Sequence, residues 1–362
     1  MIVEPLRSDR PIPIVVRPSS KSEATLSSLL GYIKGNKKFI EDTRLKNGAI
    51  LFRDFDIENA SDFEQVAHLI HPNLNDGYLG VTARTNRTKY VFTCKYLFST
   101  TEVTNIAPIG QHTEMAYMTN RPNRIFFCCL KEPKHGGETP ITDMRQVVLD
   151  ADKHDPNLLK QFKAHGLTYY RNYSTPGTKV KDIAEVRSWP DIYKTTDKTE
   201  VEKVCAKDDI ECIWHGDALS LVSKFPAIRK HPETGDEVWS NAVPVFYPRM
   251  RTYEFRKMIQ TIGTWWYYLM YLLWIVIESL RRLFIPDTQC GLYVTYGNGV
   301  PIRTEELFKI EDIIWDNMVT FKWKKGDVIY IDNDRVSHGR LPYFGQRQIV
   351  CALGMPDVKS ST

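Results

Sequence analysis

Short runs of alternating hydrophobic and polar residues follow one another along most of the chain. Runs of this kind, bounded by Gly, Pro, Asn or Asp, are typical of β-strands. They dominate residues 48–57 and 104–176 and return at 291–297, 319–323, 326–332 and 347–354. The pattern therefore predicts a mainly β protein.

Helical spacing occurs outside these runs. Apolar residues recur at helical intervals over 22–47 and again over 61–72, and we expect a helix in each segment. Residues 177–215 are charged and irregular in pattern, which predicts helix and loop at the periphery. Residues 1–20 are rich in Pro and Arg, and we expect an irregular N-terminal arm there.

One segment, 264–284, departs from this pattern. No residue from Thr264 to Ile277 is charged, and Arg281 and Arg282 follow. The run is shorter than the roughly 20 apolar residues that a membrane-spanning helix needs, and predicted strands lie on both sides of it. We interpret it as a buried helix or an active-site lid. A helix that lies on a membrane surface or docks a partner is the alternative, because tyrosine and tryptophan suit an interfacial position.

Composition narrows the class of protein. The 362 residues are 42% hydrophobic and 25% charged, which is typical of a globular chain with a large core. The net charge is +4 and the basic residues are scattered, so no nucleic-acid partner is indicated. An odd number of cysteines without zinc-like spacing, and no apolar run typical of a signal peptide, predict reduced thiols and a cytoplasmic location. Membrane association through 264–284 stays open.

The stretch "IGQHTEMAY" contains the first candidate for chemistry. His112 and Glu114 stand two residues apart, so an extended backbone directs both side chains to the same side. A non-haem iron site needs two histidines and one carboxylate, with the other face of the metal left open. His-x-Glu alone is a weak signal, and a second histidine from a distant strand is required.

His338 is the strongest candidate for that second histidine, with His165 in reserve. It follows a predicted strand and turn in "GDVIYIDNDRVSHGR", and Arg347 lies nine residues beyond it. A guanidinium binds a carboxylate through two parallel hydrogen bonds. Arg347 therefore suits the far carboxylate of a keto acid that chelates the metal.

Three motifs in this order carry a family resemblance: "HTE", "GGETPI" and "HGRLPYFGQR". Together they resemble the taurine dioxygenase/clavaminate synthase-like superfamily of Fe(II)- and 2-oxoglutarate-dependent oxygenases, over roughly residues 45–357. The resemblance implies a mainly β fold with peripheral helices (α+β), a distorted double-stranded β-helix or jelly roll. It also implies one domain over 21–362, with an insertion or lid at about 177–290.

The resemblance implies roles for five residues. His112, Glu114 and His338 would be the iron ligands, and Thr139 and Arg347 would bind the distal carboxylate of 2-oxoglutarate. The cofactor is then Fe(II), with 2-oxoglutarate and O2 as cosubstrates and succinate and CO2 as co-products. A carboxylate at position 114 argues against halogenation, because halogenases of this class carry a small residue there.

The substrate pocket is less well defined by the sequence. Asn105, Trp239, Asn241 and Arg340 are candidates to contact substrate. The competing interpretations are core packing, hydrogen bonding at strand ends and, for Arg340, an ion pair with an acidic neighbour such as Asp332 or Asp334. Cys351 stands where taurine oxygenases carry a substrate-anion arginine, so a sulfonate held in that manner is not expected.

We expect the substrate to be a small, carboxylate-bearing, amino-acid-like metabolite of specialised metabolism. Its C–H bond would be hydroxylated, or the substrate desaturated or cyclised. A lipid or carrier-bound substrate at a membrane is the alternative, suggested by 264–284. A non-catalytic jelly-roll sensor is a further alternative, which the complete set of predicted ligands disfavours.

Overall fold

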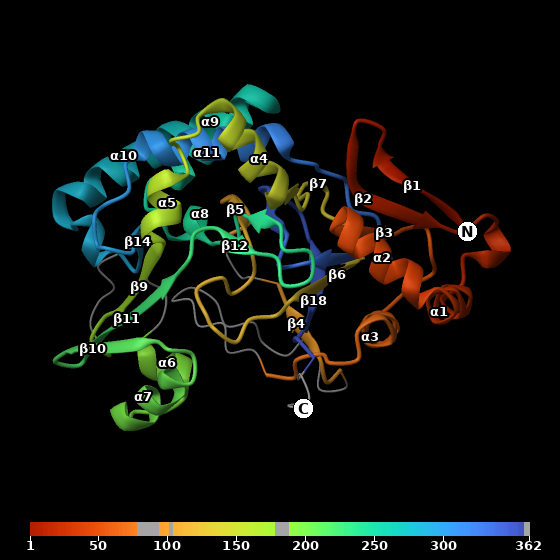
Figure 1. The fold of residues 1–362 in the computed structure, drawn as a ribbon, viewed down its shortest axis with the longest axis horizontal. Coiled ribbons are helices and arrows are strands. Elements are labelled where there is room, and N and C mark those ends of the chain that lie inside the picture. Colours follow the sequence, from red (N-terminus) through yellow and green to blue (C-terminus); the bar gives the residue numbers. More distant parts are fainter. Residues whose placement is uncertain (78–93, 101–103, 178–187, 358–362) are drawn as a thin grey trace.

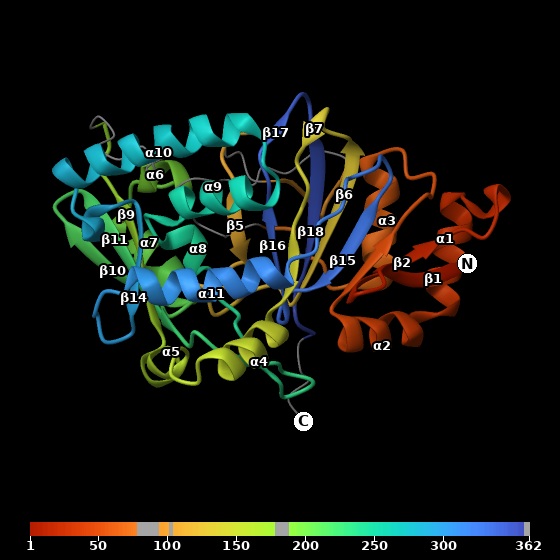
Figure 2. The same ribbon diagram turned by 90° about the horizontal axis from the view of Figure 1, so that it is seen from above.

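A seven-stranded sheet forms the centre of the molecule in the computed structural model, which describes residues 1–77, 94–100, 104–177 and 188–357 (Figures 1 and 2). All neighbouring strands are antiparallel except the parallel pair β2–β3. The strand order is β1 (Ile2–Arg7), β2 (Arg10–Arg17), β3 (Ala49–Phe52), β15 (Val328–Asp332), β6 (Arg124–Lys131), β18 (Gln348–Gly354) and β4 (Leu97–Ser99).

Successive side chains of a strand point to opposite faces, and in the central strands β3, β15, β6 and β18 both faces are buried. Phe126 and Tyr330 stack on the face covered by helices α1 (Leu26–Gly35) and α3 (Ala60–Ile70). Phe127 and Ile329 point into the larger core on the other face. Figure 2 shows α1, α2 (Lys37–Asn47) and α3 on one side of the sheet and the helices from α4 onward on the other.

Two smaller sheets lie across the larger core. One has the order β10 (Glu211–His215), β11 (Ala218–Phe225), β9 (Leu167–Tyr173) and β14 (Leu292–Tyr296). The other has the order β5 (Ile109–His112), β16 (Val336–Arg340) and β8 (Ile141–Asp143). Strand β11 falls within 177–290 and pairs along its length with β9, so this part of the predicted insertion supplies a sheet strand.

The remaining elements are short strands, further helices and 3-10 turns. The two-stranded pairs are β7 (His135–Gly136) with β17 (Tyr343–Phe344) and β12 (Arg229–Lys230) with β13 (Glu237–Val238). The helices are α4 (Met144–His154), α5 (Lys160–His165), α6 (Trp189–Tyr193), α7 (Lys198–Ala206), α8 (Val243–Phe246), α9 (Met250–Thr261), α10 (Trp265–Phe284) and α11 (Thr304–Asn317); the 3-10 turns are η1 (Lys21–Glu23) and η2 (Asp287–Gln289).

The predicted helices and most predicted strands are confirmed, but the irregular N-terminal arm is wrong. Residues 2–17 form the hairpin β1–β2, and β2 extends the central sheet beside β3. Val15 and Val16 are fully buried there, and this burial outweighs the prolines that suggested an arm. The predicted strand at 319–323 is also wrong, because only an isolated bridge joins Val319 to Ile141.

The interpretation of 264–284 as a buried helix is wrong as well. The segment forms the twenty-residue helix α10, which packs on α9, and Tyr267 is its one buried residue. Figure 2 shows α10 on the outside of the molecule. Within the described residues, no helix has the length and apolar character needed to cross a membrane.

Candidate metal and cosubstrate site

Pairing of β5 with β16 brings the two candidate histidines together. The antiparallel register sets His338 directly opposite His112, and their ring centroids are 4.6 Å apart. Gly339 makes this close approach possible, since a Cβ there would lie 2.6 Å from the backbone oxygen of Ile109. The distant histidine therefore reaches the first one through strand register.

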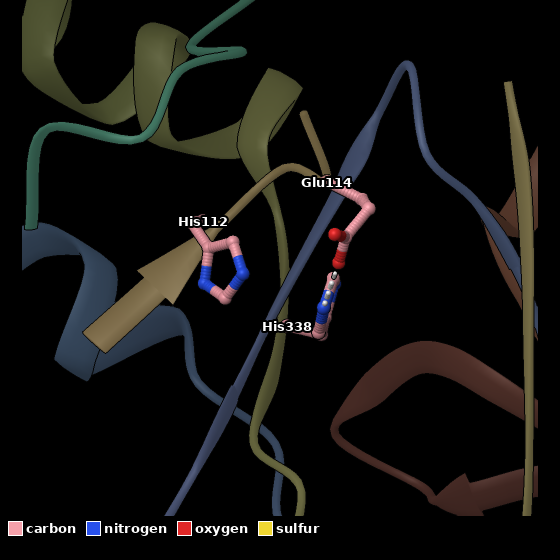
Figure 3. Close-up of side chains that lie close together, drawn as sticks. All are labelled: His112, Glu114 and His338. Atoms are coloured by element: carbon pink, nitrogen blue, oxygen red, sulfur yellow. Dashed lines mark ion pairs between the residues drawn. The ribbon is translucent and has the colours of Figure 1, made fainter. Parts of the chain in front are cut away.

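Glu114 completes the cluster from the turn that follows β5. Its Oε2 lies 3.5 Å from Nε2 of His338 (Figure 3). One nitrogen or oxygen atom from each of His112, Glu114 and His338 lies within 4.8 Å of the others. The structure thus groups the three residues that the sequence nominated as ligands.

The protonation pattern of the cluster fits a metal. Nδ1 of His112 is 2.9 Å from the carbonyl oxygen of Gly110, so this nitrogen donates and Nε2 keeps a lone pair for a ligand. A hydrogen bond of this kind fixes the tautomer and the ring orientation of a metal-binding histidine. Two imidazoles and one carboxylate with open positions suit Fe(II).

Asn333 fixes the backbone of Glu114, and sequence reasoning missed it. Its side-chain oxygen accepts the Glu114 N–H at 2.7 Å, and its amide donates to the carbonyl oxygens of Glu114 at 3.0 Å and Pro122 at 2.7 Å. Asn333 is fully buried in the turn between β15 and β16. The only feature of the sequence that points to Asn333 is its place in the "DND" turn before His338.

A second group of side chains lies beside the cluster. Nη2 of Arg347 is 3.4 Å from the hydroxyl oxygen of Thr139, and Nε donates to the Gly137 carbonyl at 3.1 Å. Trp323 also donates to Thr139, at 3.0 Å. Since Thr139 accepts both bonds, its hydroxyl hydrogen is left for a bound acceptor. A residue with a side chain would not fit at Gly137, because φ is +77° and a Cβ there would lie 2.9 Å from Pro133.

One cavity connects the two groups. It holds about 410 Å³ of space, part of it open to solvent. Its lining comprises Thr100, Ile109, His112, Phe127, Thr139, His338, Gly339, Arg340, Arg347 and Ile349. The apolar members were not predicted, because strand alternation alone does not distinguish a cavity wall from a packed core.

The cavity is positively charged on one side. Burial lowers the pKa of Arg340 and of Arg347 to about 10 in each case, and the nearby Arg340 charge contributes to the shift at Arg347. Both guanidiniums remain protonated at neutral pH. Among the described residues no carboxylate forms an ion pair with Arg347, so this wall of the cavity favours a bound anion.

Arg340 is the substrate candidate that the structure places in the cavity. Its Nη2 donates to the carbonyl oxygens of Thr104 at 2.6 Å and Ala107 at 2.9 Å, which hold the guanidinium in place. The suggested ion pair with Asp332 or Asp334 is not formed. Asp332 binds Arg44 and His231, and Asp334 binds Arg121.

The other substrate candidates do not line this cavity. Trp239 packs in the core, edge-on to Phe162, and Cys351 is fully buried in β18. The Asn105 amide donates to the Tyr343 carbonyl oxygen. The side-chain amide of Asn241 donates to the carbonyl oxygen of Ala227, and its side-chain oxygen accepts the N–H of Val243. The backbone carbonyl oxygen of Asn241 accepts the N–H of Thr113, which lies between the two candidate ligands.

The sheets and the His–Glu–His cluster beside an arginine–threonine pair define a non-haem iron dioxygenase. The chain belongs to the taurine catabolism dioxygenase TauD, TfdA family, whose model matches residues 8–353. It is accordingly a 2-oxoglutarate-dependent dioxygenase, with Fe(II) as its metal and 2-oxoglutarate and O2 as cosubstrates.

Two relatives resemble the chain over nearly its whole length. The dapdiamide synthesis protein DdaC of Enterobacter agglomerans is 27% identical over 352 residues, covering 97% of this chain and 93% of the relative. A clavaminate synthase-like protein of Arabidopsis thaliana is 28% identical over 356 residues, covering 95% and 94%.

Solved structures share the fold at low identity. PvcB of Pseudomonas aeruginosa aligns with a TM-score of 0.51 and 10% identity, covering 97% of this chain and 90% of that one. A putative alpha-ketoglutarate-dependent taurine dioxygenase from Burkholderia xenovorans aligns with a TM-score of 0.50 and 16% identity, covering 99% and 90%. At these identities the likeness extends to the fold alone.

Proposed function

We propose that this dioxygenase oxidises an unactivated C–H bond of a small, carboxylate-bearing, amino-acid-like metabolite. The reaction is a hydroxylation, or an oxidative cyclisation or desaturation, and succinate and CO2 are the co-products. The observation that carries the proposal is the pair of guanidiniums, buried Arg340 and partly buried Arg347, in the cavity beside the histidines. One of them suits 2-oxoglutarate and the other a second carboxylate, from the substrate.

The residues divide into three roles. His112, Glu114 and His338 would hold Fe(II), which together with 2-oxoglutarate and O2 supplies the oxidant for C–H cleavage. Arg347 binds the distal carboxylate of 2-oxoglutarate through its fork of N–H groups, and Thr139 donates its hydroxyl hydrogen to the same carboxylate. Arg340 binds and orients the substrate carboxylate.

We also infer that the central sheet and the smaller sheets across the core form a distorted jelly roll, as expected from the family. In this interpretation 21–362 is a single domain with an insertion or lid at about 177–290, although no described residue of that segment lines the cavity. The charge at Glu114 supports oxygenation over halogenation, since a carboxylate occupies the position that a halide would need.

Two measurements test this proposal. Anaerobic addition of Fe(II) and 2-oxoglutarate should give a weak charge-transfer band near about 500 nm, as expected of a facial-triad site; the band should be lost in His338→Ala. Amino acids and other carboxylates are then screened for substrate-dependent succinate, with mass spectrometry of the product. A gain of one oxygen indicates hydroxylation, and a loss of two hydrogens indicates desaturation or cyclisation.

A lipid or carrier-bound substrate is the second candidate. It is favoured by the position of α10, whose first turn contacts β17 next to the cosubstrate side of the cavity: the rings of Trp266 and Phe344 meet edge-on at 5.0 Å. Succinate formation that depends on an acyl substrate and not on any free amino acid would select this candidate.

A further inference from the structure

Helix α10 presents an apolar face to solvent. Its exposed large hydrophobic residues recur every three or four positions, so they form one continuous stripe along the helix. Each is at least 45% exposed. The stripe comprises Trp265, Tyr268, Leu269, Leu272, Leu273, Val276, Leu280, Leu283 and Phe284.

The inward face of α10 is apolar as well over the first half of the helix. Trp266, Met270 and Trp274 pack against the larger core. No residue from Trp265 to Ile277 is charged, and a helical segment that is apolar all round is normally buried in protein or in lipid, but α10 lies on the outside of the molecule (Figure 2). With about 200 Å² for each fully exposed side chain, the stripe presents on the order of 1,000 Å², against 300–600 Å² for the largest patch of a typical monomer. A covering partner is therefore required.

The surroundings of the stripe are positively charged. Residues 249–284 contain six basic side chains, Arg249, Arg251, Arg256, Lys257, Arg281 and Arg282, and two acidic ones, Glu254 and Glu278. Arg249 and Lys257 form ion pairs with Asp287 and Asp312, which leaves four arginines. Burial raises the pKa of Glu254 and Glu278 and so favours their neutral forms. The remaining charge in this segment is therefore positive.

This positive charge favours an anionic lipid surface over a second copy of the chain as the partner that covers the stripe. In a symmetric dimer through α10, the same basic patch would face its own copy, and like charges would repel. An anionic lipid surface provides the opposite charge together with an apolar layer beneath it. Tryptophan and tyrosine near the start of the stripe suit the headgroup level, and the helix is not apolar enough to span.

We propose that α10 docks the enzyme on a bilayer that contains anionic lipid, with the helix lying in the plane of the surface and its exposed stripe inserted. The proposal is independent of the substrate and of iron. Docking brings β17, and with it the arginine–threonine side of the cavity, close to the membrane, because Trp266 packs on Phe344 and Tyr343 pairs with Gly136.

Vesicle sedimentation of the full-length protein tests the proposal. We expect binding to vesicles of phosphatidylcholine mixed with phosphatidylserine, and weaker binding to phosphatidylcholine alone. The triple variant Leu269→Gln, Leu272→Gln, Val276→Gln should bind both kinds at least tenfold more weakly, because apolar insertion is lost. Leu149→Gln is the matched control, since Leu149 on α4 is 55% exposed and lies in no such stripe.

A charge variant separates electrostatic attraction to anionic lipid from insertion of the apolar stripe. Arg281→Gln with Arg282→Gln should reduce binding to anionic vesicles roughly tenfold or more and leave binding to neutral vesicles unchanged, since each basic residue near the surface contributes about 1 kcal/mol. The charge-transfer band with Fe(II) and 2-oxoglutarate, retained in each variant, shows that the fold is intact.

Three outcomes would overturn the proposal. The first is wild-type protein that stays in the supernatant with both kinds of vesicle. The second is a triple variant that folds and binds vesicles as the wild type does. The third is a molar mass, measured by analytical ultracentrifugation, that rises to a dimer in the wild type and not in the triple variant, without vesicle binding; the stripe would then be an interface between two copies of this chain.

Discussion

Replacing Arg347 with Gln should weaken 2-oxoglutarate binding while leaving the metal cluster in place. The guanidinium donates to Gly137 and Thr139 and forms no ion pair with a carboxylate among the described residues, so its charge is available to a bound anion. Removing one partner of a hydrogen-bonded charge pair costs about 2–5 kcal/mol. Because Arg347 is only partly buried, we expect the lower half of this range, a loss of roughly 30- to 300-fold in affinity.

Two matched variants refine this prediction. Arg347→Lys keeps the charge but loses the planar fork, so its affinity for 2-oxoglutarate should fall between those of wild type and Arg347→Gln. Thr139→Val removes one neutral hydrogen bond and should cost about 1 kcal/mol, or about fivefold. Since the two side chains touch, their combined effect should depart from additivity by at least about 0.5 kcal/mol.

The assay is an anaerobic titration of the Fe(II) protein with 2-oxoglutarate, followed at the charge-transfer band, with the KM for 2-oxoglutarate in succinate formation as a second measure. Binding of Fe(II) alone, measured by calorimetry, should be the same in all variants. The assignment of Arg347 would be refuted by an Arg347→Gln protein that binds iron normally and retains the wild-type affinity for 2-oxoglutarate.

Three further predictions concern the metal cluster and the stability of the fold. Asn333→Ala should lower Fe(II) affinity 10- to 100-fold, as removal of an outer-shell partner does, and calorimetric iron binding unchanged from wild type would contradict it. Glu114→Ala should reduce substrate-dependent succinate formation at least 100-fold, because one of the three candidate ligands is lost, and succinate formation at the wild-type rate would contradict this role. Burial raises the pKa of Glu254 to about 8, so the stability from its neutral form is present below about pH 4.5 and is lost as the pH rises through 8. Glu254→Gln should therefore raise the melting temperature at pH 8 more than at pH 5, and equal shifts at both pH values would exclude this cause.

Much of the fold could be predicted from local pattern. The strands β6, β9, β15 and β18 and the helices α1 to α3 lie where alternation or helical spacing predicted them. The N-terminal hairpin was missed because its prolines suggest irregular chain, whereas the burial of Val15 and Val16 beside β3 decides its conformation. That burial depends on β3, which lies outside residues 1–20.

The candidate site was predicted unevenly for a physical reason. His112, Glu114, His338, Thr139 and Arg347 carry functional groups whose chemistry is specific enough to nominate them from motif and order. Asn105, Trp239, Asn241 and Cys351 have side chains that suit a pocket or a core equally well, and the structure places them outside the cavity. Asn333 was overlooked because its importance comes from hydrogen bonds to Glu114 and Pro122, on a segment distant in the sequence.

The amino-acid sequence by itself determined the type of chemistry, because the ligand atoms and the cosubstrate guanidinium are properties of the residues themselves. It also determined that 264–284 would be helical and apolar. The tertiary structure decided the remaining points. Strand register set His338 opposite His112, the cavity wall selected Arg340 from the substrate candidates, and packing on α9 and the core partly covered one face of α10 while leaving the other in solvent. Hydrophobicity says only that a face will be covered, and which surface covers it depends on the shape and charge of everything around it.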